Sequence, residues 1–414
     1  MKLRNRHAAA FAAMMTVGLL AGSVTAFAEA EDVTLKIWVP EEAVDDTDAA
    51  IAAFDELHDE FNITYEIAIV GIDEAPAQVE TDADVAADIF YVPSGGVTDM
   101  VNKGLLLPLV KDYETIKDDL PESALTAVTV YNEAAGMDLQ YAVPFSPNTY
   151  FLYYNKDYFD EEEVKSLDTM MAKDLGDGVW NFCTKMTDSW FTESFFMGND
   201  CTLFGPDGTD PTECSFNNEA GFASGQYMIE LAANPKYLEN IDGAGDSSFK
   251  DGNLGAITTG AWMAPDFKEA LGDKLGACAL PVANIGGKEV QLSNFVDFKT
   301  ICVKSNTAYP LCAQQLAVFL GNPENSLTRY QNQGDVPVLK SLSESDEIKA
   351  DIVASALNDQ AALATNQPSI PQMGGYWDAM KAFGDGVYYK DITEDNLQAQ
   401  LDALVDAIVA TLAD

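Results

Sequence analysis

Histidine and positive charge are both scarce in this chain of 414 residues. Two histidines occur, and 23 lysines and arginines stand against 67 aspartates and glutamates, which gives a formal net charge of −44. A surface this acidic repels nucleic acid and anionic membranes, so the composition excludes both as partners. His7 lies in a leader-like segment, so a Ser-His-Asp or Cys-His catalytic arrangement would have to use His58.

The signatures of nucleotide, redox and metal chemistry are also missing. No P-loop and no Gly-x-Gly-x-x-Gly turn follows an expected strand, and no Cys-x-x-Cys pair occurs. The histidine count excludes a histidine-rich metal site. We therefore expect no metal, no cofactor and no catalytic residue. Acidic residues are so numerous that a secreted acid-pair glycosidase stays open as an alternative.

Six cysteines are present, an even number that suits an oxidising compartment. They are expected to form structural disulfides or buried thiols. Cys201 and Cys214 bracket a polar loop and could close a hairpin, and Cys278 could pair with Cys302 or Cys312. Cys183 is the sixth, and sequence alone does not fix the connectivity.

Residues 1–28 have the pattern of an export signal. A basic start precedes an apolar run at 8–22, which is short and rich in alanine, and Ala-Phe-Ala at 26–28 fits a cleavage site. Ser23 stands where a lipoprotein would carry its lipidated cysteine. We expect a periplasmic, extracellular or cell-surface protein, whose net charge after cleavage falls to −47 because three basic residues leave with the signal.

The remaining 386 or so residues suggest two domains. Their first third alternates strand and helix patterns. Strands are expected at 35–39, 63–69 and 88–92, with a helix between the first two that Asp48 caps. The apolar side of that helix would carry Ile51, Phe54, Leu57 and Phe61. A further helix, ended by Gly104, would follow the third strand. This order indicates an α/β fold with a parallel sheet and a ligand at the strand carboxyl ends.

Later segments indicate a second α/β unit. The aromatic run from Tyr150 to Tyr154 reads as a strand that enters it. Near the end, Thr393 is expected to cap a helix with an apolar face, formed by Leu397, Leu401, Leu404 and Ile408.

The segment from Ile370 to Trp377 carries the clearest hint of function. A proline and two glycines precede Tyr376 and Trp377, and a helix-like stretch follows from Asp378 to Phe383. Aromatic rings placed where a loop meets a helix can stack on the C–H face of a sugar. The alternative is that these rings pack the last helices together.

Short motifs lie, in order, at 35–38, 88–91, 104–106, 143–144, 153–157, 256–262, 280–281 and 370–377. In this order they resemble the solute-binding proteins of carbohydrate ABC importers, and maltose/maltodextrin-binding proteins in particular. The resemblance spans the whole chain after the leader. It implies a two-lobe periplasmic-binding-protein fold whose lobes, joined by a hinge, close on a sugar. The implied N-terminal lobe is 29–147 plus about 293–337, and the C-terminal lobe about 148–292 plus 338–414.

The resemblance also implies which residues bind the ligand. Trp377, Trp262 and Trp190 match stacking positions, with Tyr376 beside the first. Asp188 matches a hydroxyl-binding acid, and Asn148 stands where the family has another acid, an exchange that adds a donor. Glu42 and Lys381 match polar positions that could equally be solvated surface. Trp38 and Trp180 are expected in the core.

The first lobe departs from the family pattern. Val92 replaces a stacking aromatic, and Gly95 and Gly96 replace an acid-base pair.

As a whole, the resemblance implies a non-enzymatic, monomeric protein that binds α-glucan oligosaccharides of the maltodextrin type and passes them to the membrane permease of an ABC importer. A different oligosaccharide remains an alternative cargo.

Overall fold

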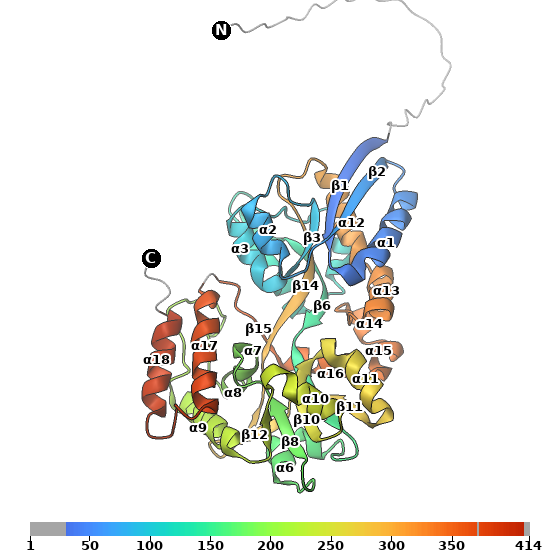
Figure 1. Ribbon diagram of the computed structural model, residues 1–414. Coiled ribbons are helices and arrows are strands. Elements are labelled where there is room, and N and C mark those ends of the chain that lie inside the picture. The colour runs from blue at the N-terminus through green and yellow to red at the C-terminus, as the bar shows by residue number, and fades with distance from the viewer. Residues whose placement is uncertain (1–29, 371, 410–414) are drawn as a thin grey trace, which may run out of the picture.

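The computed structural model of the chain describes residues 30–370 and 372–409. Two lobes, each built on its own β-sheet, lie one above the other, and strands connect them (Figure 1). We call the lobe that contains β1 the N-lobe and the other the C-lobe. The export signal expected at residues 1–28 lies outside the described residues.

The N-lobe sheet has the order β15-β14-β3-β1-β2, with β6 paired to β14. Its strands are β1 (Glu31–Val39), β2 (Phe61–Ile69), β3 (Ile89–Pro93), β6 (Ala142–Asn148), β14 (Phe295–Val303) and β15 (Thr365–Asn366). β1 is parallel to both β2 and β3, which confirms the expected βαβαβ arrangement. β14 is antiparallel to β3 and β6, because it re-enters the lobe from the other end.

Helices cover both faces of this sheet. They include α1 (Val44–Leu57), α2 (Ala75–Thr81), α3 (Val97–Asn102), α4 (Glu114–Lys117), α5 (Glu122–Ala127), α12 (Pro310–Leu320) and α13 (Pro323–Gln333). The expected cap Asp48 is wrong, since α1 begins at Val44. Ile51 and Phe54 are buried as expected, but Leu57 is 69% exposed and Phe61 already belongs to β2.

The C-lobe sheet has the order β11-β7-β10-β8-β9. Its strands are β7 (Tyr150–Asn155), β8 (Trp180–Thr184), β9 (Tyr237–Glu239), β10 (Leu254–Gly260) and β11 (Leu275–Cys278). The expected strand at 150–154 is confirmed and enters this lobe. Two separate hairpins complete the strands of the molecule. In the N-lobe, β4 (Thr129–Asn132) pairs with β5 (Met137–Gln140), and in the C-lobe, β12 (Val282–Ile285) pairs with β13 (Lys288–Gln291).

Helices of the C-lobe pack around that sheet, and α17 and α18 lie to one side of it (Figure 1). They are α6 (Leu167–Ala172), α7 (Ser189–Thr192), α8 (Ser194–Met197), α9 (Glu219–Ala233), α10 (Ala244–Lys250), α11 (Ala264–Leu271), α15 (Asp346–Ala350), α16 (Ile352–Leu363), α17 (Met373–Tyr388) and α18 (Leu397–Val409). The expected face of α18 is confirmed, because its four residues are all buried. Thr393 lies four residues before α18 and does not begin it. α17 begins at Met373, so the two glycines lie in its first turn and not in a loop.

The chain passes between the lobes at three places. β6 runs into β7 at Asn148–Tyr150, β14 starts at Phe295 beside the C-lobe core, and a third passage lies between α13 and α15. β15, which follows α16, pairs with the first two residues of β14 at this junction. The short helix α14 (Lys340–Ser343) hydrogen-bonds Asp119 of the N-lobe through its first two backbone N–H groups. These bonds keep α14 with the N-lobe, whereas the sequence-based boundary placed it in the other lobe.

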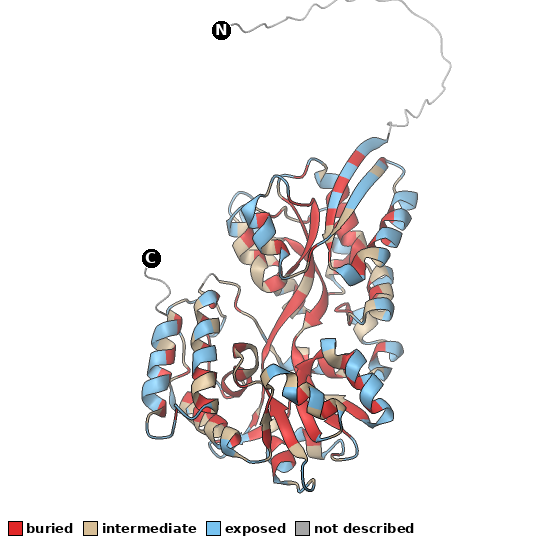
Figure 2. Ribbon diagram, viewed as in Figure 1, coloured by how far each residue is buried: buried red, intermediate tan, exposed pale blue. Residues whose placement is uncertain are grey.

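Burial follows the central strands of both sheets (Figure 2). All six cysteines are free thiols, so the expected disulfides are wrong and the buried-thiol alternative holds for Cys183, Cys201, Cys302 and Cys312. Cys201 and Cys214 do flank a hairpin, held by bonds between Thr202 and Ser215, but the pair is not joined covalently.

Candidate functional site

The edge of the C-lobe sheet that faces the N-lobe gathers the aromatic side chains. The parallel strands β8 and β10 end there, and antiparallel β7 begins there, with Gly260 of β10 paired to Tyr150 of β7. Each segment that follows these strand ends carries a tryptophan, Trp190 in α7 and Trp262 just after β10. Open α/β sheets present ligand sites at this edge.

Trp262 is the most accessible of these rings. It is 54% exposed and its six-membered ring lies directly against the backbone of Gly260. A Cβ at position 260 would come within 1.9 Å of that ring, so only glycine lets the indole lie flat on the strand end. The ring is thus held against the strand end while about half of the residue stays exposed.

Trp190 and Trp377 form a second aromatic unit. Their ring centroids lie 6.1 Å apart, and Trp190 also meets the edge of Tyr150 at 6.4 Å. Trp377 packs against Phe295 at the start of β14 and against its neighbour Tyr376. Both tryptophans are half-buried. The pair is therefore connected, through Tyr150 and Gly260, to the strand end on which Trp262 rests.

Tyr376 does not contact the cleft surface. It is fully buried, and its hydroxyl donates to the carbonyl of Ser189 at 2.9 Å. This bond fixes α17 on α7 and so holds Trp377 beside Trp190. The expectation that Tyr376 touches the ligand is therefore replaced by a packing role.

Asp188 and Lys381 have partners within the C-lobe. One carboxylate oxygen of Asp188 caps α7 by accepting from the N–H of Trp190, and the other pairs with Lys185 at 3.0 Å. Lys381 is exposed and paired with Asp385 one turn later. Asp188 thus positions the turn that carries Trp190, and Lys381 lies outside the cavities described next.

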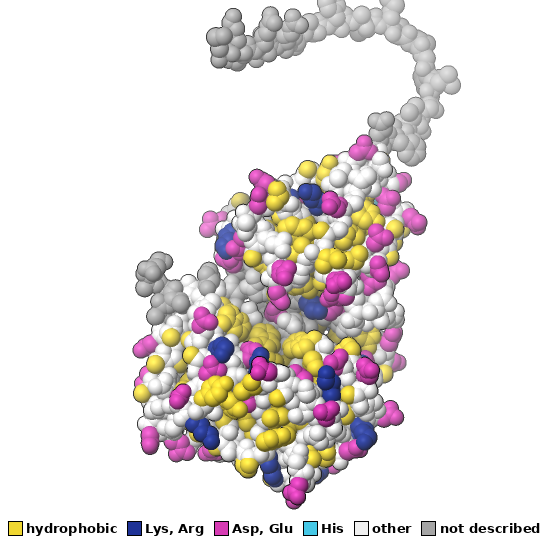
Figure 3. Space-filling model, viewed as in Figure 1, with side chains coloured by type: hydrophobic (Ala, Val, Ile, Leu, Met, Phe, Trp, Pro, Cys, Tyr) yellow, Lys and Arg dark blue, Asp and Glu magenta, His cyan; other side chains and the backbone are white. Residues whose placement is uncertain are grey.

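Two adjoining cavities lie between the lobes. One, of about 520 Å³, has Trp262 and α16 on its C-lobe side and α13 on the other. A second, of about 510 Å³, lies against the β1 and β2 ends of the N-lobe. Glu42, Asn148 and Lys299 line both, so the two spaces form one cleft. Figure 3 shows the hollow between the lobes, with hydrophobic side chains on the C-lobe edge below it.

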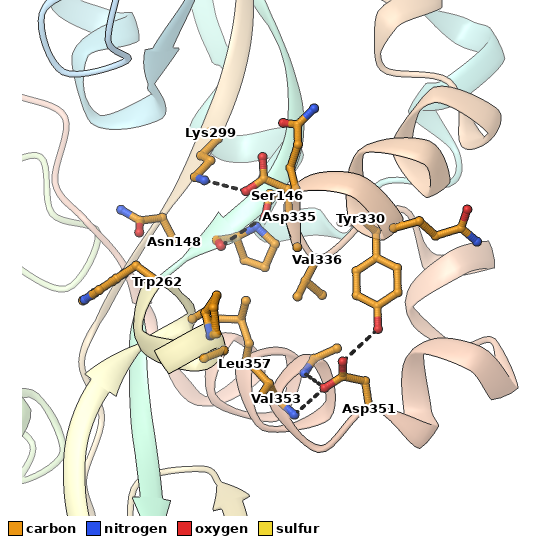
Figure 4. A pocket seen from close by; sticks show the side chains of 18 of the residues that line it. Ser146, Asn148, Trp262, Lys299, Tyr330, Asp335, Val336, Asp351, Val353 and Leu357 are labelled. Carbon is orange, nitrogen blue, oxygen red and sulfur yellow. Dashed lines mark hydrogen bonds and ion pairs between the residues drawn. The ribbon is translucent and has the colours of Figure 1, made fainter. Parts of the chain in front are cut away.

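Four charged side chains of the larger cavity form two ion pairs (Figure 4). Lys299 on β14 bonds Asp335 on the third connecting segment, and Lys268 bonds Asp351 at 3.0 Å. Tyr330 donates to the same Asp351 oxygen at 3.1 Å. Burial acts to raise the pKa of Asp351, but the Lys268 bond and two backbone N–H groups outweigh it and lower that pKa. The cavity thus offers oriented polar groups beside the apolar Val353 and Leu357, a mixture that suits a sugar.

Asn148 marks the centre of the cleft. Its Nδ2 donates to Oδ1 of Asp297 at 2.7 Å, and the two residues face each other across the β6–β14 ladder. Asp297 is 5% exposed, and burial together with nearby Asp73 raises its pKa to about 6. Asn148 and Lys299 oppose that rise by stabilising the carboxylate.

The N-lobe wall is poor in rings. Val92 is fully buried, so it offers nothing to the cleft. A Cβ on Gly95 would meet Nε2 of Gln367 at 2.4 Å, because the strand β15 region lies over it. The space above Gly96 is open. At Val92, Gly95 and Gly96, the N-lobe therefore has neither the stacking ring nor the acid-base pair of the family pattern.

Sequence reasoning missed the polar residues of β14 and the connecting segments. Asp297, Lys299, Asp335, Tyr330 and Asp351 line the cleft, yet no family motif pointed to them. One pattern could have found two of them: Asp297 and Lys299 interrupt an otherwise apolar strand, Phe295–Val303. A charge inside a central strand is costly unless it is paired, which suggests a functional position.

The comparisons with known proteins agree with this geometry. Residues 49–356 match the family model of the bacterial extracellular solute-binding proteins. The chain belongs to this family. The relatives named below are binding proteins for sugars. Among the residues of this chain that the structure describes, no helix is long and apolar enough to cross a membrane.

Among relatives of this solute-binding protein, a galactooligosaccharide-binding protein of Bacillus subtilis is 28% identical over 83% of this chain and 82% of its own length. A maltooligosaccharide ABC transporter solute-binding lipoprotein of Streptococcus pneumoniae is 24% identical over 76% and 74%. The solved structure of the maltodextrin-binding protein MalE1 from L. casei, without ligand, is 25% identical, covers 91% and 99% of the two chains, and has a TM-score of 0.83. This structural match confirms the two-lobe fold.

Proposed function

We propose that this protein binds α-glucan oligosaccharides of the maltodextrin type outside the cytoplasmic membrane and delivers them to the permease subunits of an ABC importer. The observation that carries the proposal is the interlobe cleft, in which the exposed Trp262 lies beside paired polar groups, with the Trp190–Trp377 pair packed nearby through Tyr150. Relatives and solved structures named for maltodextrin or maltooligosaccharide support it. The protein acts as a monomer and has no catalytic role.

Binding would use both ring stacking and hydroxyl bonds. An aromatic pair contributes ~0.5–1.5 kcal/mol beyond the area it buries. Three such rings, with several hydrogen bonds from groups such as Asn148 and Glu42, make a dissociation constant near micromolar reasonable, about −8 kcal/mol. Trp262 and Asn148 share the larger cavity, so a sugar stacked on the first can reach the second.

Closure of the lobes would complete the site. A sugar first stacks on the C-lobe rings, and rotation about the three connecting segments then brings Glu42 and the N-lobe wall onto it. The lobes would be about 29–147 plus 293–337 and 148–292 plus 338–414, with α14 moving with the N-lobe. The closed form is the one that an importer would recognise.

A different oligosaccharide is the second candidate cargo. The B. subtilis relative named for galactooligosaccharide matches 83% of this chain, compared with 76% for the S. pneumoniae relative named for maltooligosaccharide. Stacking platforms accept the apolar face of more than one sugar, so rings alone do not decide between the two cargoes.

Two assays test the proposal. Incubation of the purified protein with maltotetraose should leave the sugar intact, whereas release of glucose or maltose would establish a glycosidase. A thermal-shift panel of maltodextrins and galactooligosaccharides should raise the melting temperature most with maltodextrins. A larger shift with galactooligosaccharides would transfer the assignment to that class.

A further inference from the structure

We infer that Asp297 is a positioning residue that fixes the side-chain amide of Asn148 so that its carbonyl oxygen, and not its NH2 group, faces the ligand. The inference rests on the proposed function, because it concerns how the same cleft recognises a sugar hydroxyl. Asp297 lies on β14, one of the segments that connect the lobes, and is separate from the three tryptophans.

The geometry places the two groups in direct contact. Asn148 and Asp297 are partners across the antiparallel β6–β14 ladder, so their side chains emerge on the same side. Nδ2 of Asn148 lies 2.7 Å from Oδ1 of Asp297. Asp297 is almost completely buried, while Asn148 is half-exposed and lines both cavities. The carboxylate therefore lies behind the amide, and the ligand space lies in front of it.

The chemistry of the pair decides which atom the ligand meets. An ionised carboxylate can only accept hydrogen bonds, so it must face the NH2 group of the amide. The carbonyl oxygen then points away from Asp297, toward the cleft. A charged partner also polarises the amide and strengthens its oxygen as an acceptor. Together the two residues present an acceptor where related proteins are expected to carry an acid.

Proton binding by Asp297 should weaken this arrangement. Burial and the charge of Asp73 raise its pKa to about 6, whereas the Asn148 bond and Lys299 lower it. The other charged residues that line the same cavity are Glu41, Glu42 and Glu74. Above pH 7 the carboxylate fixes the amide. As the pH falls through 6, the acid can donate to Asn148, and the amide is free to turn.

A charge-neutral swap tests the inference. Asp297→Asn replaces a group that can only accept with an amide that can also donate, so the orientation of Asn148 is no longer fixed. It should weaken maltotetraose binding by about three- to tenfold at pH 7.5, measured by calorimetric titration. The double variant Asn148→Asp with Asp297→Asn reverses the two roles, because the new amide donates and the new carboxylate accepts. It keeps the net charge of the wild type and should recover affinity relative to the single variant, binding at least about twofold more tightly than Asp297→Asn.

Stability and pH profiles separate positioning from a structural role. The melting temperature of Asp297→Asn at pH 7.5 should equal or exceed that of the wild type, because the variant no longer buries a charge. Wild-type affinity should fall several-fold between pH 7.5 and 5, and that of the double variant should stay level. The wild-type profile needs no mutation, so it tests the inference even where a variant fails to fold.

Each outcome has one meaning. Equal affinity of wild type and Asp297→Asn, or a double variant as weak as the single one, would overturn the inference and leave the proposed function in place. Wild-type affinity that does not change between pH 7.5 and 5 would also overturn it. If maltotetraose and every other oligosaccharide of the panel fail to bind the wild type, the proposed function fails and this inference with it.

Discussion

Three tryptophans supply the ring surface of the C-lobe, and their surroundings differ. Trp262 lies on a glycine and is 54% exposed, whereas Trp190 and Trp377 support each other and are half-buried. Removal of the exposed ring should therefore cost mainly binding, and removal of either supported ring should also cost some stability. This difference separates ligand contact from packing within one set of residues.

Trp262→Ala should weaken maltotetraose binding by roughly 1–3 kcal/mol, the usual loss for a central aromatic contact. Calorimetric titration measures the loss, and thermal unfolding without ligand should change little. Trp190→Ala and Trp377→Ala should lose similar affinity. The control is Trp180→Ala, since Trp180 begins β8, at the end of that strand away from the N-lobe, and packs on a C-lobe core cluster. It should lose stability and keep binding; the same pattern in Trp262→Ala would assign that ring to packing.

Glu193 provides a pH test at the junction of the C-lobe with β14. Its side chain is fully buried and accepts from the N–H of Phe295 at 3.3 Å, and burial raises its pKa well above the usual value. A carboxyl with a raised folded-state pKa costs stability as pH rises above the unfolded pKa, about 4.5. Glu193→Gln keeps the acceptor oxygen without the charge. Its melting temperature should match the wild type near pH 4 and exceed it at pH 8, and equal curves at both would contradict the buried charge.

Helices and strands differ in how far the sequence revealed them. The periodic face of α18 was predictable, because Leu397, Leu401, Leu404 and Ile408 repeat at helical spacing. The start of α1 was not, since Val44 begins it without a side-chain cap. The cleft was only partly predictable. Trp262 came from a motif, whereas the Asn148–Asp297 contact joins residues 149 positions apart, which no local pattern encodes.

The cap of α7 can be tested by two substitutions at one position. Asp188→Ala removes the acceptor for the Trp190 N–H and should cost about 1 kcal/mol of unfolding free energy. Asp188→Asn keeps that acceptor and should retain most of the stability. Urea unfolding compares the two. If Asp188 acts only through the cap, Asp188→Asn should also keep sugar affinity, and a large loss there would instead show a direct carboxylate contact.

At the level of the molecule, the two cavities and the three connecting segments make closure the natural response to a ligand. Glu42, Asn148 and Lys299 touch both spaces, so a bound sugar can contact both lobes at once. Small-angle scattering should show a lower radius of gyration with saturating maltotetraose than without it. Identical scattering curves, at a concentration where calorimetry shows binding, would contradict closure.

Ligand length follows from the unequal lobes. The N-lobe wall has Val92 buried and Gly95 covered by Gln367, so a disaccharide gains little from it beyond the C-lobe rings. A longer chain can extend past Trp262 into the cavity bounded by Tyr330 and Asp351. More contacts should then recover the missing energy.

Calorimetric titration with maltose, maltotriose and maltotetraose tests the central claim most directly. We predict that maltotriose or longer binds at least about tenfold more tightly than maltose, a difference of ~1.4 kcal/mol. Maltose binding as tightly as maltotetraose would contradict the predicted use of the extended cleft. No binding of any of the three would contradict the α-glucan assignment itself.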